Sequence, residues 1–132
     1  MLQVDIPSRG LLRLGYLGLD VNGTLALDGQ LTPAAYDRLA KLSKTLDLWL
    51  TSADTQGTLT ELATALRAKT QRLQSGDEAA RKAALVDELG AERVVAIGNG
   101  ANDAAMLQRA ALGIVVLGGE GLATACLTAR QL

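Results

Sequence analysis

Short apolar runs alternate along most of this chain with segments whose leucines recur every three or four residues. The runs 46–50, 94–97 and 114–117 have the length of β-strands, and the segments before them have the period of α-helices. These runs contain few polar residues, which is typical of strands that are covered on both faces. The order of elements therefore predicts an α/β fold, built from right-handed βαβ units around a mostly parallel sheet.

Patterns and caps set the expected boundaries of the elements. The expected strands are 2–6, 11–20, 46–50, 72–74, 94–97 and 114–117, and the expected helices are 33–44, 55–68, 77–89, 102–111 and 121–129. The first two strands are expected to form an N-terminal hairpin, and 25–31 a smaller one. Thr32 before Pro33 predicts a helix start, Asp77 a cap on a later helix and Gly90 the end of that helix.

The composition excludes several classes of protein. The 132 residues suit a single domain over 1–132, and the core must be built from Leu, Ala, Val and Ile because aromatic residues are only 2%. The chain has no histidine and one cysteine, which excludes Ser-His-Asp catalysis, a histidine or cysteine zinc site and an internal disulfide. A net charge of -1 argues against nucleic-acid binding, and no apolar run approaches the roughly 20 residues of a membrane span. A reduced, cytoplasmic location is expected.

Charged and polar residues stand where the expected strands end. Asp20 ends one strand, Ser52 follows the next, and Asp103 follows a later one, while Lys82 lies near the start of a helix. The carboxyl ends of parallel strands form the ligand-binding edge of an open α/β sheet. Two carboxylates can hold Mg²⁺, and a hydroxyl, an ammonium and backbone N–H groups can bind phosphate oxygens. This set therefore predicts a site for phosphate with a divalent cation.

Some of these residues also have a purely structural interpretation. Asp20 could be a turn residue at the end of a strand. Asn102 and Asp103 could be a pair that caps a helix, and Asp54 could cap the helix that begins near Thr55.

Two positions have a neighbour that competes for the same role. Lys82 could be a solvated helix lysine, with the adjacent Arg81 at the site instead. Whether Ser52 or Thr51 reaches the site depends on the register of the strand, and the pattern favours Ser52.

The same segments resemble the motifs of the haloacid dehalogenase (HAD) superfamily. Residues 20–25, Asp-Val-Asn-Gly-Thr-Leu, are similar to its motif one, Ser52 to motif two, Lys82 to motif three and 98–103, Gly-Asn-Gly-Ala-Asn-Asp, to motif four. More narrowly, 52–54 and 98–103 resemble the TGD and GDGxND signatures of P-type ATPase phosphorylation domains. The chain thus resembles the soluble P-type ATPase-like hydrolases over most of its length, which implies a Rossmann-like, three-layer α/β/α fold.

The resemblance implies a role for each site residue. Asp20 would be the nucleophile that forms an aspartyl-phosphate, and Lys82 would neutralise charge on Asp20 and on the phosphoryl oxygens. Mg²⁺ would be held by Asp20, by the backbone carbonyl of Asn22 and by Asp103. The residues that would bind phosphate are Val21, Asn22, Ser52, Ala53 and Lys82, and those in supporting positions are Gly23, Thr24, Asp54, Asn99 and Asn102.

Two positions depart from the pattern of the superfamily. Its phosphatases usually carry an aspartate two residues after the nucleophile as general acid and base, a role typically worth about 10²- to 10⁴-fold in rate. Here that residue is Asn22, whose amide cannot exchange the proton. Asn99 stands where motif four often has an aspartate. We therefore expect weaker Mg²⁺ binding and slow turnover, with a catalytically impaired phosphate-binding or regulatory module as the alternative.

The connections leave no room for a cap domain. Only 26–32 separates motif one from the first helix, and only 75–81 separates the third strand from Lys82. An ATP-driven pump is therefore not expected. Capless members of the superfamily often act on macromolecules or close the site through oligomerisation, which predicts a phosphorylated small-molecule or macromolecular substrate and a homo-oligomer.

Overall fold

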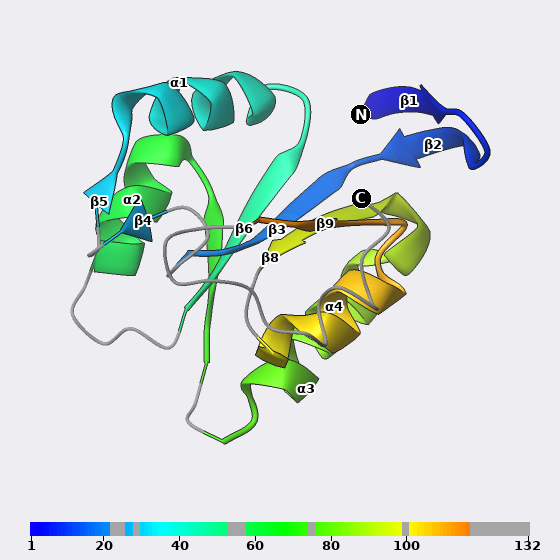
Figure 1. Cartoon of the computed structure of the whole chain (residues 1–132). Coiled ribbons are helices and arrows are strands. Elements are labelled where there is room, and N and C mark those ends of the chain that lie inside the picture. Colours follow the sequence, from blue (N-terminus) through cyan, green and yellow to red (C-terminus); the bar gives the residue numbers. More distant parts are fainter. Residues whose placement is uncertain (22–25, 28–29, 53–57, 74–75, 99–100, 117–132) are drawn as a thin grey trace.

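A parallel sheet of five strands forms the centre of the molecule. The computed structural model describes residues 1–21, 26–27, 30–52, 58–73, 76–98 and 101–116. The strands of the sheet are β3 (Tyr16–Asp20), β6 (Asp47–Ser52), β7 (Lys69–Arg72), β8 (Val94–Gly98) and β9 (Leu112–Val115). Their order across the sheet is β7-β6-β3-β8-β9, with every pair parallel (Figure 1). The chain therefore winds outward from β3 in both directions, and the carboxyl ends of strands at such a switch point are where open α/β sheets bind their ligands.

Helices cover both faces of this sheet (Figure 1). They are α1 (Pro33–Leu42), α2 (Thr58–Leu66), α3 (Glu78–Leu89), the 3-10 helices η1 (Ala91–Arg93) and η2 (Ala101–Asp103), and α4 (Ala104–Arg109). The helices α1 and α2 lie together, and α3 lies against α4. This arrangement confirms the expected three-layer α/β/α fold.

Successive side chains of a strand point to opposite faces of the sheet, and the core accordingly consists of two clusters. Leu19 of β3 and Leu50 of β6 are fully buried and belong to a cluster with Leu39 of α1 and Leu59 of α2. On the other face, Ala96 belongs to a cluster of β8, α3 and α4 residues. Two apolar clusters, one on each face, hold the strands in register and so fix where each strand ends.

A close contact of α4 with the sheet depends on a glycine. A side chain at Gly113 of β9 would collide with the backbone carbonyl of Leu107 in α4. Glycine therefore lets this helix lie directly on the sheet.

Two small antiparallel hairpins complete the described part of the chain. One consists of β1 (Leu2–Ile6) and β2 (Gly10–Leu14), and the other of β4 (Ala26–Leu27) and β5 (Gln30–Leu31). The prediction of a single strand over 11–20 was wrong, because the chain changes partner at Gly15. The N–H of Gly15 donates to the carbonyl of Arg93 at 2.9 Å, and its carbonyl accepts from the N–H of Asp47 at 2.9 Å. Since β3 is already paired on both sides, β2 pairs with β1 instead.

Several predicted boundaries shift by a few residues. The strand expected at 72–74 lies at Lys69–Arg72, and the one expected at 114–117 lies at Leu112–Val115. The helix expected over 102–111 begins with η2 and ends at Arg109, because Ala110 is extended. The helix expected over 121–129 lies outside the described residues.

Helix caps agree with the sequence at two positions and differ at one. The Thr32 hydroxyl accepts from the N–H of Ala35 at 3.2 Å, and Gly90 ends α3 with a φ of 97°. Asp77 stands at the start of α3 but makes no capping hydrogen bond; instead the carboxylate of Glu78 accepts from the N–H of Gly76 at 3.1 Å.

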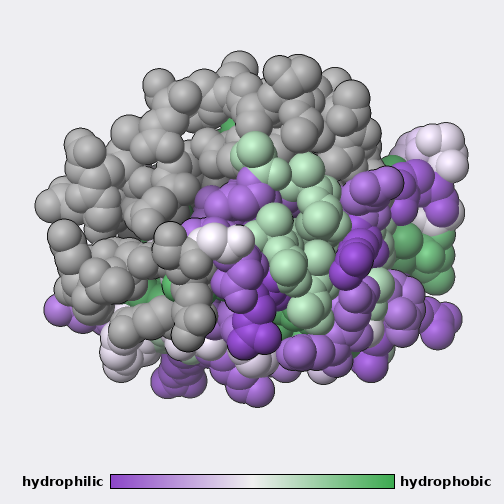
Figure 2. Space-filling view, turned by 90° about the horizontal axis from the view of Figure 1, so that it is seen from below, coloured by the Kyte–Doolittle hydropathy of each residue, from purple (hydrophilic) through white to green (hydrophobic). Residues whose placement is uncertain are grey.

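No helix in the described ranges is both long enough and apolar enough to cross a membrane. In the described part of the face shown in Figure 2, a pale green, weakly hydrophobic area lies among hydrophilic residues.

Candidate functional site

Three charged residues from separate segments meet at the carboxyl edge of the sheet. Asp20 is the last residue of β3, Lys82 lies in α3, and Asp103 is the last residue of η2. The Nζ atom of Lys82 lies 2.6 Å from Oδ1 of Asp103 and 3.3 Å from Oδ1 of Asp20. The ammonium also donates to Oδ1 of Asn102 at 3.2 Å. The structure therefore brings together the acid, the lysine and the second acid that the sequence places at one site.

Burial distinguishes Lys82 from its neighbour. Lys82 is 1% exposed and Asp103 is 0% exposed, whereas Arg81 is exposed. A lysine is almost never fully buried unless it is paired. Lys82 shares the buried face of α3 with Leu85 and Val86, three and four residues further along the helix. The interpretation of Lys82 as a solvated lysine, with Arg81 at the site, is therefore wrong.

Gly98 makes room for the carboxylate of Asp103. A Cβ atom at Gly98, the last residue of β8, would stand 2.5 Å from Cγ and 2.6 Å from Oδ2 of Asp103. The carboxylate thus lies directly against the backbone at the end of this strand. The sequence interpretation gave Gly98 no role of its own, although a glycine at the end of an apolar strand is the signal for such a close approach.

The interpretation of Asn102 and Asp103 as a cap pair does not hold for the aspartate. Asp103 stands at the start of α4 but makes no capping hydrogen bond there. Its side chain is directed to Lys82 instead. Asn102 is exposed, and its amide oxygen also accepts from Lys82.

The surroundings of Asp20 change the charge state of its carboxyl group. The pKa of Asp20 is raised from an ordinary 3.8 to about 6, mainly by burial and further by the nearby Asp103 carboxylate. The Lys82 ammonium acts in the opposite direction. Two carboxylates therefore share one ammonium in a site with little water, and this excess of negative charge favours a bound cation.

The donor atoms fit Mg²⁺. This ion takes one or two protein carboxylates and keeps several waters or phosphate oxygens in its octahedron. Asp20 and Asp103 provide two such carboxylates. In the part of the chain that the structure describes, no group of three or more acidic, histidine or cysteine side chains is placed to hold a metal. The third predicted ligand is a backbone carbonyl, that of Asn22, which lies outside the described residues.

The strand β6, beside Asp20, carries Thr51 and Ser52, the two hydroxyl residues between which the sequence does not decide. Thr51 pairs with Asp20 in the register of β3 and β6, and its hydroxyl donates to the carbonyl of Leu19 at 3.2 Å. The Thr51 side chain thus stabilises the strand pair. Ser52 is the last residue of β6 and is 2% exposed, at the edge where Asp20 lies.

The backbone N–H of Val21 is engaged within the sheet. It donates to the carbonyl of Thr51 at 3.1 Å. A role for this N–H in binding phosphate would require that hydrogen bond to break. The other predicted site residues lie outside the described part of the chain: Asn22, Gly23, Thr24, Ala53, Asp54 and Asn99.

Comparisons with known proteins identify relatives by structure and not by sequence. No protein-family model and no curated protein matches the sequence. A protein from Streptomyces avermitilis MA-4680, assigned to the HAD family of hydrolases, matches with a TM-score of 0.69 and 20% identity over 89% of this chain and 73% of its own. A 3-deoxy-D-manno-octulosonate 8-phosphate phosphatase from Moraxella catarrhalis, solved with magnesium, phosphate and KDO, matches with a TM-score of 0.64 and 20% identity over 85% of this chain and 71% of its own.

The catalytic domain of a CPx-ATPase is also similar. The CPx-ATPase CopB-B matches with a TM-score of 0.56 and 25% identity over 76% of this chain, which corresponds to 39% of that chain. These likenesses confirm that the chain has the HAD-like fold, as its motifs predict.

Proposed function

We propose that this chain is a Mg²⁺-dependent phosphohydrolase or phosphotransferase that acts through an aspartyl-phosphate on Asp20. The observation that carries the proposal is the buried cluster of Asp20, Lys82 and Asp103 at the carboxyl edge of a HAD-like sheet. The similarity to a phosphatase that was solved with magnesium and phosphate supports it.

In this proposal Asp20 attacks the phosphorus of a phosphate ester. A bond forms between a carboxylate oxygen of Asp20 and phosphorus, and the bond from phosphorus to the ester oxygen breaks. A pKa of about 6 leaves Asp20 mostly ionised at pH 7, as a nucleophile must be. Lys82 holds the Asp20 carboxylate in place and offsets negative charge on the transferred group.

A metal ion would complete the charge balance. Asp20, Asp103 and the carbonyl of Asn22 would hold Mg²⁺, which supplies positive charge to the phosphoryl oxygens when bound. Ser52 and the backbone at Ala53 would bind the remaining phosphate oxygens.

The proposed turnover is slow because Asn22 cannot act as general acid and base. Water must attack the aspartyl-phosphate without that help, and the leaving oxygen must take its proton from solvent. Exchange of Asn22 for aspartate is therefore expected to raise turnover by up to about 10²- to 10⁴-fold.

The test is hydrolysis of p-nitrophenyl phosphate with Mg²⁺, followed by a panel of phosphorylated metabolites. Asp20→Asn should abolish turnover. Asp87→Asn is the matched control, since Asp87 lies on α3 with a side chain 56% exposed, paired with Arg109. Turnover that survives Asp20→Asn would refute the aspartyl-phosphate. If the wild type turns over quickly and Asn22→Asp does not increase its rate, the proposed role of Asn22 is refuted.

A second candidate is a phosphate-binding or regulatory module without turnover. The amides at Asn22 and Asn99, where acids are usual, favour it. Beryllium fluoride with Mg²⁺ separates the two candidates. An adduct on Asp20 supports the enzyme, whereas no adduct and no bound metal at millimolar Mg²⁺ supports the module.

We further propose that the protein is cytoplasmic and that it binds a phosphorylated substrate and further copies of the chain. We do not expect it to bind nucleic acid or a membrane. The short connections 26–32 and 75–81, which leave no room for a cap domain, support the oligomer, because a second copy could cover the site. Sedimentation as a monomer at micromolar concentration and above would contradict that part of the proposal.

A further inference from the structure

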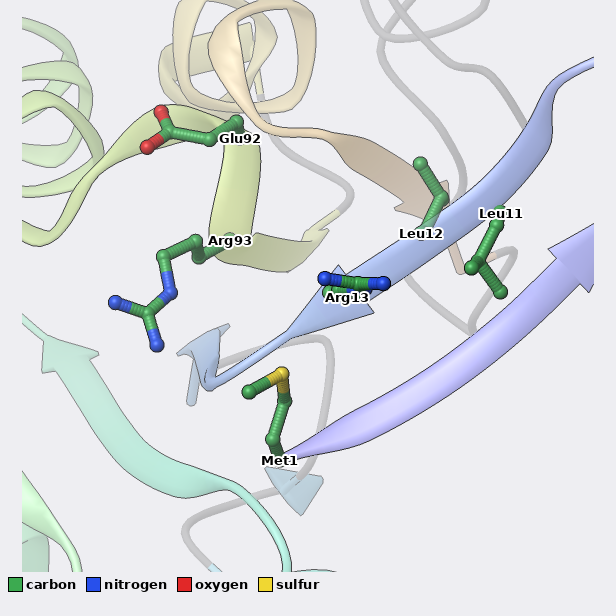
Figure 3. A pocket seen from close by; sticks show the side chains of 6 residues that line it. All are labelled: Met1, Leu11, Leu12, Arg13, Glu92 and Arg93. Carbon is green, nitrogen blue, oxygen red and sulfur yellow. The ribbon is translucent and has the colours of Figure 1, made fainter.

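A hollow lies at the opposite end of the sheet from Asp20. It is a cavity of about 670 Å³ between β2 and η1 (Figure 3). The residues that line it are Met1, Leu11, Leu12, Arg13, Glu92 and Arg93. Arg93 directly precedes β8 and Arg13 comes shortly before β3, so the cavity lies where the central strands begin.

The backbone that carries Arg93 is fixed at both ends of η1. The carbonyl of Arg93 accepts from the N–H of Gly15 at 2.9 Å, and the carbonyl of Ala91 accepts from the N–H of Ala111 at 2.9 Å. The guanidinium lies over the junction of β2 and β3, with Nε and Nη2 3.9 Å from where a Cβ on Gly15 would stand. One wall of the cavity is therefore held in place by the main sheet.

Two arginines reach this cavity without an acidic partner. Among the described residues, the ion pairs are those of Lys82 and of Arg109, and none includes Arg13 or Arg93. Glu92 contributes the one carboxylate of the lining, and Figure 3 shows it apart from both guanidinium groups. The cavity thus carries an excess of positive charge in a chain whose net charge is -1.

The rest of the lining is apolar, and two of its three residues are exposed. Met1 is 61% exposed and Leu11 is 54% exposed, and they are two of the three large hydrophobic side chains that are exposed in the described part of the chain. In Figure 3 the Met1 side chain points to the same space as Arg13 and Arg93. A ligand that covered these side chains would remove apolar surface from water.

We propose that this cavity binds a small organic anion, with a carboxylate or phosphate group on an apolar body. A guanidinium binds either group through two parallel hydrogen bonds, and two guanidinium groups line this cavity. The volume lies in the range of small-molecule sites. Met1, Leu11 and Leu12 would receive the apolar body. Because the cavity shares no residue with the Asp20 cluster, the proposal stands whether or not the chain is a phosphatase.

The test is an NMR titration of the full chain without Mg²⁺, with benzoate as the probe. Benzamide has the same shape without the charge, acetate has the charge without the ring, and phenylphosphonate replaces the carboxylate with a phosphorus acid that cannot be hydrolysed. The variants are Arg13→Gln with Arg93→Gln, and the matched control is Arg81→Gln, an exposed arginine on α3.

We expect benzoate or phenylphosphonate to bind with a Kd of about 1 mM or below and to shift the amides of Leu12, Arg13 and Arg93. Whichever of the two binds more tightly identifies the anionic group. Benzamide and acetate should bind at least about tenfold more weakly, as should the probe to the double variant, whereas Arg81→Gln should leave binding unchanged. Any of three results would overturn the proposal. Benzamide could bind as tightly as benzoate, the double variant could bind the probe as tightly as the wild type, or these amides could show no shift at about 10 mM probe.

Discussion

Replacement of Lys82 by methionine tests whether its ammonium compensates buried negative charge. Methionine keeps most of the length of the side chain and removes the charge. The Nζ atom lies 2.6 Å from an oxygen of Asp103, which is 0% exposed. Removal of one partner of a buried ion pair typically costs about 3–5 kcal/mol, because the other charge stays buried without compensation. The neutral side chain no longer has to be desolvated, so we expect a loss near the lower value, about 3 kcal/mol.

The assay is urea unfolding without metal at pH 7, followed by the fluorescence of Trp49, the one tryptophan of the chain. Domains of this size are typically stable by about 5–15 kcal/mol, so the variant should still fold. Arg81→Met is the matched control, since this neighbour is exposed and should change stability by about 0.5 kcal/mol or less.

A double variant separates charge compensation from packing. If the cost comes from an uncompensated carboxylate, Asp103→Asn in the Lys82→Met background should recover much of the lost stability. Added Mg²⁺ should stabilise Lys82→Met more than Asp103→Asn, because a dication that binds the folded state can replace the lost charge only where the carboxylate remains. A loss no larger than that of Arg81→Met, or no recovery in the double variant, would refute this account of Lys82.

Three further predictions concern the same edge of the sheet. Gly98→Ala would place a methyl group 2.5 Å from Cγ of Asp103, so it should cost about 1–3 kcal/mol in urea unfolding and abolish turnover, and normal turnover would refute the close contact. The raised pKa of Asp20, about 6 against 3.8 unfolded, stabilises the fold at low pH and loses that effect as the pH rises through about 6. Without metal, the wild type should therefore lose about 2 kcal/mol relative to Asp20→Asn between pH 4 and pH 7, and a constant difference would contradict this. Thr51→Val should cost about 1 kcal/mol of stability with turnover kept, whereas Ser52→Ala should reduce turnover; turnover that is lost in Thr51→Val and kept in Ser52→Ala would exchange their roles.

The sequence predicts well those features that depend on local patterns. Leucines at strand and helix periods identify the strands and helices that form the layers of the fold. As expected, Thr32 caps the start of α1 and Gly90 ends α3. The placement of Asp20 at a strand end follows from one apolar run and one acid. The helical period also favours Lys82 over Arg81, because Lys82 lies on the same face of α3 as the buried Leu85 and Val86.

Features that depend on distant partners are not predicted. The break at Gly15 arises because β3 is paired on both sides, and no local pattern shows that. The strand β7 is an edge strand of polar residues, Lys-Thr-Gln-Arg, so it lacks the apolar run by which its neighbours are found. The role of Gly98 depends on how the carboxylate of Asp103 packs after the next turn of chain.

The ion pair of Lys82 and Asp103 has a consequence for the order in which the site assembles. These two residues are 21 positions apart and are linked by α3, η1, β8 and η2, whereas Asp20 lies much further back in the chain. Closure of a short loop costs less entropy than closure of a long one, so the lysine and its nearer acid can come together before β3 joins them. Asp20 would then be the last of the three charges to arrive, and insertion of its strand β3 between β6 and β8 would join the two halves of the sheet and assemble the three charges in one event.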